Sequence, residues 1–168
     1  MKKLPVGLTL IFMVSALILL SVVSPSCSRM PAAFWKNYHP ELILEKSSDQ
    51  GPWGGVRKIV WKSETANTFT AKQLIDYAAQ NGWQLADSLI LIGGSLEIPA
   101  NASGTDYSLS ILQEEALQLL NATTCRIFLF KTGWIAVEPG NARDTEITGF
   151  LVLNPNGDEL AMFHRWGE

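Results

Sequence analysis

The two histidines, His39 and His164, are the first residues to consider, because an imidazole can act as an acid or a base near neutral pH. His164 lies in a predicted last strand, where Leu160, Met162 and Trp166 occupy the same alternating side. This position is compatible with an acid–base role at a sheet surface, but it is more typical of a residue in an amphipathic edge strand. His39 stands outside any predicted element, and the sequence assigns it no role.

Sequence patterns of hydrolases and of metal sites are missing. Gly93-Gly94-Ser95 places a serine after a turn, but it lacks the Gly-x-Ser-x-Gly frame of a nucleophile elbow. No Cys-x-x-Cys, His-x-x-x-His or twelve-residue calcium loop occurs. We therefore predict no catalytic residue, no metal site and no cofactor. A hydrolase whose Asp, Glu or His164 side chains meet only in the folded chain stays open as the alternative.

Tryptophan is the residue type that points to ligand binding, because its large ring supplies contact area on a surface. There are six tryptophans. Three belong to predicted strands or a helix end, where core packing explains them: Trp61, Trp83 and Trp134. Three lie in less regular stretches and are the expected surface residues: Trp35, Trp53 and Trp166. We choose Trp53, in the loop 51–55, as the first candidate, with Trp166 and His164 as further candidate ligand-binding residues.

The N-terminal segment 1–27 has the layout of an export signal. Lys2 and Lys3 precede a run of mainly apolar residues from Leu4 to Val23, and small residues follow. A run of this length could also span a bilayer as a helix. The segment is therefore predicted to be a signal peptide or a retained membrane anchor.

Ser24-Pro25-Ser26-Cys27 resembles the lipobox of bacterial lipoproteins, with Ser24 where a leucine is typical. The resemblance implies that Cys27 becomes the first mature residue and carries a diacylglycerol on its sulfur. The alternatives are cleavage after Ser26 without lipidation, a retained anchor, and a disulfide with Cys125. The disulfide is disfavoured, because Cys125 opens an apolar predicted strand in which a free thiol packs as a small hydrophobe.

Every fate of this segment exports the domain, so we expect it at the outer face of the cytoplasmic membrane or in the periplasm. The expected partners are the lipid bilayer, through an acyl chain or the N-terminal helix, and a protein. Nucleic acid is not expected, because without Lys2 and Lys3 eleven Lys and Arg stand against sixteen Asp and Glu, with no basic stripe.

The remainder is divided into a tether, 28–40, and a single globular domain, 41–168. Phe34, Trp35 and Tyr38 in the tether either sit at lipid headgroups or dock onto the domain. Residues 47–55 are predicted to form a loop, because they are rich in Ser and Gly.

Capping boxes predict one helix that begins after Thr70 and ends at Gly82, and a second that begins after Ser110 and ends near Asn121. Strands are predicted over 41–46, 56–62, 83–92, 125–131, 134–137, 147–153 and 159–166, with turns at 132–133 and 154–157. The predicted fold is α+β: an antiparallel sheet of about six strands backed by two helices, after an N-terminal hydrophobic helix.

These observations predict a non-enzymatic, membrane-tethered extracytoplasmic binding domain. The alternatives are an extracytoplasmic hydrolase and a structural or immunity-type protein of the envelope.

Overall fold

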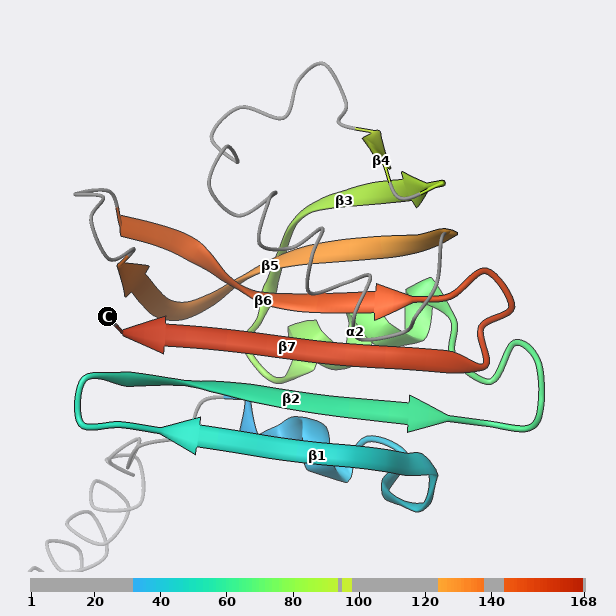
Figure 1. The fold of residues 1–168 in the computed structure, drawn as a ribbon, viewed down its shortest axis with the longest axis horizontal. Coiled ribbons are helices and arrows are strands. Elements are labelled where there is room, and N and C mark those ends of the chain that lie inside the picture. The colour runs from blue at the N-terminus through green and yellow to red at the C-terminus, as the bar shows by residue number, and fades with distance from the viewer. Residues whose placement is uncertain (1–31, 94, 98–123, 138–143, 168) are drawn as a thin grey trace, which may run out of the picture. The chain divides into compact units, whose positions relative to one another are not determined.

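A computed structural model describes residues 32–93, 95–97, 124–137 and 144–167 (Figure 1). The predicted N-terminal helix and the predicted helix over 110–121 lie outside these residues, as does Cys27. The described residues form two short 3-10 helices, η1 (Ala33–Asn37) and η2 (Pro40–Leu42), one α-helix, and seven strands.

The strands form one sheet in the order β1-β2-β7-β6-β5-β3-β4, and all neighbours in this order are antiparallel. Six strands have eight residues or more and β4 has three, so the predicted antiparallel sheet is confirmed. Their bounds are β1 Ile43–Gln50, β2 Gly54–Lys62, β3 Gln84–Ile92, β4 Ser95–Glu97, β5 Thr124–Val137, β6 Asp144–Leu153 and β7 Glu159–Gly167.

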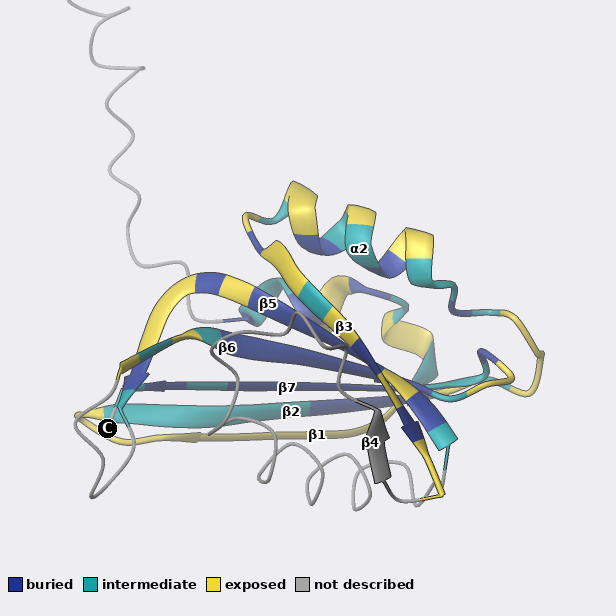
Figure 2. Ribbon diagram, turned by 90° about the horizontal axis from the view of Figure 1, so that it is seen from above, coloured by how far each residue is buried: buried dark blue, intermediate teal, exposed yellow. Residues whose placement is uncertain are grey.

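The predicted loop over 47–55 is wrong, because most of it is a β-hairpin. β1 continues to Gln50, β2 begins at Gly54, and Gln50 pairs with Gly55. Polar composition suggested a loop, but β1 is an edge strand exposed over most of its length (Figure 2). Such a strand tolerates charged and hydroxyl side chains on both faces.

The helix α2 (Ala71–Gln80) begins and ends where its sequence signals predicted. The Thr70 hydroxyl accepts from the Gln73 amide and donates to the Gln73 side-chain oxygen, at 3.4 and 2.7 Å. At the other end Gly82 has a φ of 87°, its amide donates to Ala79 O, and the Trp83 amide donates to Ala78 O. This pair of bonds is a Schellman ending, and Trp83 is its buried apolar contact.

The strand β5 runs through the predicted turn at 132–133 without reversing. Gly133 has a φ of 81°, and the pairing with β6 shifts between Lys131 and Ala136. The two residues therefore belong to a bulge over residues 132–135 that bends one long strand, a common role for a glycine with positive φ. The turn predicted at 154–157 is present, and it joins β6 to β7 around Asn154 and Gly157.

The helix α2 covers one face of the sheet, which we call the α2 face (Figure 2). The buried residues of the cluster on the α2 face that lie in α2 and the strands are Ile59, Trp61, Leu74, Ala78, Phe128, Phe130, Leu151, Leu153, Leu160 and Met162. A separate buried cluster lies on the opposite side, which we call the second face: Val60, Leu89, Leu91, Cys125, Ile127, Leu129, Phe150, Val152, Ala161 and Phe163. Strand alternation explains the division, because successive side chains point to opposite faces.

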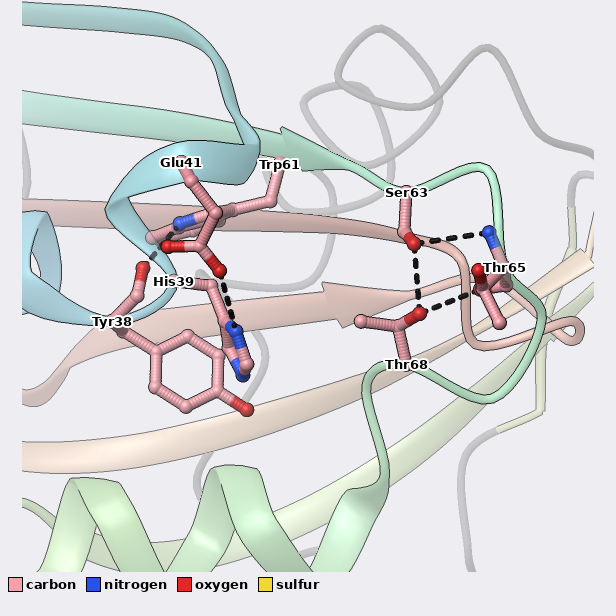
Figure 3. Close-up of polar contacts among 7 residues, drawn as sticks. All are labelled: Tyr38, His39, Glu41, Trp61, Ser63, Thr65 and Thr68. Atoms are coloured by element: carbon pink, nitrogen blue, oxygen red, sulfur yellow. Dashed lines mark hydrogen bonds and ion pairs between the residues drawn. The ribbon is translucent and has the colours of Figure 1, made fainter.

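Residues from the predicted tether are part of the core on the α2 face. Trp35 is fully buried and Tyr38 nearly so, and both contact the Trp61 ring edge-on. Trp61 Nε1 also donates to Tyr38 O at 2.7 Å, which holds the chain here (Figure 3). The packed domain therefore begins by Ala32 rather than at residue 41. Of the two alternatives for these aromatics, docking onto the domain is observed.

The strand–helix–strand unit 54–92 spans most of the sheet. β2 and β3 flank α2 in sequence, but β7, β6 and β5 lie between them. The later strands β5, β6 and β7 therefore form the centre of the sheet. The candidate site depends on the pairing of β7 with β2.

Candidate functional site

A groove lies where the β1–β2 hairpin meets the end of β7. Its volume is about 750 Å³. It is lined by Ser47, Ser48, Asp49, Gly51, Pro52, Trp53, Gly54, Gly55, Val56, Lys58, Phe163, Arg165 and Trp166. Two of the three predicted ligand-binding residues, Trp53 and Trp166, meet here although they are far apart in sequence.

Close backbone packing builds the loop that carries Trp53. The Gly51 amide donates to Gly54 O at 2.8 Å and closes the turn. Gly54 pairs with Gly167 of β7, where a Cβ would lie 1.9 Å from Trp53 O. Only a glycine at 167 therefore lets the C-terminal strand approach the loop this closely.

Trp53 is the most exposed large hydrophobic residue of the described chain, at 76%. The two other tryptophans predicted at the surface, Trp35 and Trp166, are buried instead. Trp134, predicted in the core, is 40% exposed because the β5 bulge turns it outward. The loop around Trp53 is short and closed, so the ring is presented from a fixed turn.

Trp166 forms a wall of the groove and is held from behind. Its ring stacks on the imidazole of His164 at a centroid distance of 5.0 Å and an angle of 19°. The ring of Trp134 lies 6.4 Å away. A Cβ at Gly55 would lie 2.7 Å from Trp166 Cζ2, so this glycine provides the space for the ring.

His164 lies behind this wall, fully buried, and it does not line the groove. Its Nε2 lies 3.3 Å from Thr132 Oγ1 and 3.4 Å from Thr148 Oγ1, and these two hydroxyls are 2.5 Å apart. The Trp134 amide donates to Thr132 Oγ1, and the Thr148 hydroxyl donates to Trp134 O.

Either hydroxyl can donate in the Thr132–Thr148 bond, and the roles in the two contacts with Nε2 follow from the imidazole tautomer. His164 Nδ1 is buried and has no hydrogen-bond partner among the described residues. The network ties β5, β6 and β7 together at the bulge.

Burial lowers the pKa of His164 to about 3, and the positive charge of Arg57 adds to this effect. Arg57 is directly opposite His164 in the pairing of β2 with β7. The imidazole is therefore neutral at physiological pH and lacks access to a ligand. Its observed contacts are those of a packing residue that supports Trp166.

The groove combines apolar and cationic side chains. Lys58 Nζ lies 5.4 Å from the centre of the Phe163 ring, an arrangement of cation–π type. Arg165 also lines the groove, and Asp49 is the one carboxylate among its described lining residues. A surface of this kind suits a ligand with a flat or apolar part and polar substituents.

A smaller groove of about 400 Å³ lies at the opposite end of the sheet, between the start of α2 and the start of β5. It includes Asn67, Thr124 and Arg126, and Phe69 closes it from the core side. Beside it, Ser63, Thr65 and Thr68 bond to one another and shape the loop before α2 (Figure 3). This loop has no exposed aromatic residue, so we place the candidate site at Trp53.

The other predicted chemical candidates have ordinary structural positions. His39 pairs with Glu41 at 3.2 Å on the surface (Figure 3). Gly93 has a φ of 60° and forms part of the β3–β4 turn. Cys125 is a free buried thiol. The described residues hold no group of three or more His, Cys, Asp or Glu arranged for a metal ion.

Sequence reasoning found Trp166 of β7 but missed three further lining residues of β2 and β7. Lys58, Phe163 and Arg165 carried no special pattern, although strand alternation places Phe163 and Arg165 on one side of β7. What brings them to Trp53 is the antiparallel pairing of β2 with β7, in which Lys58 faces Phe163 and Val56 faces Arg165. The sequence between these strands contains no signal for that pairing.

Within the described part of the chain, no helix is both long and apolar enough to cross a membrane. Comparison of the sequence with protein-family models and with curated proteins, and of the fold with solved structures, gives no match.

Proposed function

We propose that this protein is an exported, membrane-tethered binding domain whose ligand occupies the groove at Trp53. The observation that carries the proposal is the presentation of Trp53: a tryptophan exposed at 76% on a glycine-closed turn, at the mouth of a groove walled by a second tryptophan. Exposing so large an apolar ring costs solvation free energy, which a ligand recovers when it covers the ring.

The tether is supported by the N-terminal sequence, in which Cys27 follows a hydrophobic signal. A lipid on Cys27 would leave only residues 28–31 between the membrane anchor and the first packed residue, Ala32. The groove would then be held near the lipid surface, where a ligand of the cell envelope is at high local concentration.

The hydrolase alternative required a histidine facing a deep pocket or paired carboxylates. His164 is fully buried behind Trp166, and the groove has one described carboxylate, Asp49. No observation therefore favours the hydrolase. A structural or immunity-type protein of the envelope would use the same groove. The chemical class of the ligand distinguishes such a role from other binding functions.

Lipidation is tested by the intact mass of the protein extracted from membranes, with Cys27→Ala as the control. We expect a mass increment of a diacylglycerol on a chain that begins at Cys27, and none in the variant. An unmodified full-length mass would contradict lipidation and would support a retained N-terminal helix as the membrane anchor.

The binding site is tested by site-specific photo-crosslinking in intact cells, with a photoreactive phenylalanine in place of Trp53. Leu44 in β1 is the matched control, because it is 68% exposed and does not line the groove. We expect a discrete adduct from position 53 and none from position 44, and its mass identifies a protein, a glycan or a lipid. Equal adducts from both positions, or none from position 53, would contradict the proposal that the ligand binds in this groove.

A further inference from the structure

The second face of the sheet is apolar and buried, yet no described helix covers it. Its cluster residues are between 0% and 8% exposed, with Leu91, Ile127 and Leu129 at 0%. The helix α2 lies on the opposite face (Figure 2), and the aromatic residues of η1 pack in the cluster of the α2 face. An uncovered sheet face leaves its side chains partly accessible to water, so this face has a cover.

The cover comes from the same chain, because these residues are buried with one chain present. Residues 98–123 are the long connection that could supply it. They run from the end of β4 to the start of β5, and these two strands flank β3 on either side. The two ends of the connection therefore lie on opposite sides of β3.

The exposure of β3 shows which face is covered at this place. Ile90 and Ile92 point to the α2 side and are 39% and 49% exposed, whereas Leu89 and Leu91 point to the second face and are buried. Two pairs of similar side chains in one strand thus differ only in the face to which they point. The covered side of β3 is therefore the side that carries Leu89 and Leu91.

The sequence of the connection matches this task. The helix predicted after Ser110 has a predicted buried stripe made of Ile111, Leu112, Ala116, Leu119 and Leu120. Leu117 falls outside the stripe, and Glu114 lies on the polar side. An amphipathic segment of this kind buries its stripe against an apolar surface.

We propose that the second face of the sheet is the docking surface for this chain's own segment 98–123, which lays the apolar stripe of its predicted helix across β3, β5 and β6. The domain then has three layers: α2, the sheet and this segment. The proposal is independent of any ligand at Trp53.

Cys125 provides an internal reporter, because it is a buried thiol on the second face and becomes the sole thiol when Cys27 is replaced by Ser. The test compares Leu119→Asp with Leu117→Asp in the full chain carrying Cys27→Ser, and measures the rate at which a soluble disulfide reagent labels the thiol. We expect labelling at least tenfold faster for Leu119→Asp and unchanged for Leu117→Asp. Near-ultraviolet circular dichroism should be retained in both, because Trp35, Trp61 and Trp83 report the α2 face.

If Leu119→Asp prevents folding, Leu119→Ala and Leu117→Ala repeat the comparison with a milder change, and several-fold faster labelling is expected for the former alone. Equal labelling of the two positions in folded protein would overturn the proposal. So would protection of Cys125 that disappears on dilution, which would indicate a second copy as the cover. Loss of protection in a form lacking residues 1–26 would assign the cover to the N-terminal segment instead.

Discussion

Two aromatic side chains show how differently the same residue type is used here. Trp61 is fully buried and donates its Nε1 hydrogen to Tyr38 O, whereas Trp53 projects from a turn into solvent. The first contributes burial and a satisfied hydrogen bond to folding. The second contributes little to folding, so its exposure suggests a role in binding.

Replacement of these residues should separate stability from binding. Trp53→Ala is expected to change the free energy of unfolding by less than about 0.5 kcal/mol, since an exposed ring loses few contacts. Trp61→Ala is expected to cost about 3–5 kcal/mol, because it leaves a cavity and an unpaired carbonyl in the core. Urea unfolding followed by circular dichroism measures both values. A loss above about 2 kcal/mol for Trp53→Ala would assign it a structural role.

His164 should make the protein sensitive to mild acid. Its pKa is about 3 in the folded state and near 6.5 when unfolded, so below pH 6.5 the unfolded chain binds a proton that the folded chain excludes. Its contribution to stability is therefore complete above pH 6.5 and falls by about 1.4 kcal/mol per pH unit between 6.5 and 3.

Between pH 7.5 and 5 this amounts to a loss of about 2 kcal/mol in the free energy of unfolding. His164→Gln keeps a polar side chain that does not titrate. Between pH 7.5 and 5 its free energy of unfolding should therefore fall by about 2 kcal/mol less than that of the wild type. Urea unfolding at the two pH values gives the comparison. Parallel losses in the two proteins would show that His164 is protonated in the folded state.

At the scale of elements, glycines decide how closely the strands and loops approach. Gly149 in β6 lies under the Trp83 ring, and a Cβ there would be 2.5 Å from Trp83 Cζ3 and 2.6 Å from Thr132 Cγ2. The space at Gly149 therefore holds a hydrogen atom but no side chain. The helix end at Trp83, the β5 bulge and β6 all come close together at this position.

The pair Gly149→Ala and Gly51→Ala tests this arrangement. Gly149→Ala is expected to cost about 1–3 kcal/mol through overpacking and to change the near-ultraviolet signal of Trp83. Gly51→Ala should be tolerated within about 1 kcal/mol, because the nearest atom to its Cβ would be 3.6 Å away. Thermal unfolding of the two variants gives the values. Equal melting temperatures would show that Trp83 can move aside.

At the scale of the whole molecule, residues before the first strand complete the hydrophobic core of the domain. Trp35 and Tyr38 enter the core between α2 and the sheet, and Tyr77 donates its hydroxyl hydrogen to Phe34 O at 2.9 Å. A lipid at Cys27 would thus be joined to the domain by a very short link.

Truncation measures the contribution of this segment. A chain that begins at Pro31 should fold, whereas a chain that begins at Glu41 loses Trp35 and Tyr38 and should lose more than about 3 kcal/mol, which can exceed the stability of a small domain. Trp35→Ala in the longer chain is the matched control and should lose about 3–5 kcal/mol. Circular dichroism and thermal unfolding of the purified proteins provide the comparison. Equal melting temperatures for the two truncated chains would make the segment a peripheral tether.

Local signals in the sequence predicted the elements that depend on neighbouring residues. The Thr70 cap and the Gly82 ending define α2, the turn at 154–157 defines the last hairpin, and alternation placed His164 and Trp166 on one side of β7. These features follow from backbone hydrogen bonds and conformational preferences over a few residues, so they can be read without a fold.

Features that depend on distant contacts were decided by the tertiary structure. The Ser- and Gly-rich stretch 47–55 is mostly strand because β1 pairs with β2, and residues 132–133 lie in a bulge because β6 continues past them. Trp35 is buried because α2 and β2 provide a cavity for it, and Trp53 gains its groove because β2 pairs with β7. Composition reports the average environment of a residue type, whereas burial and strand pairing depend on partners many residues away.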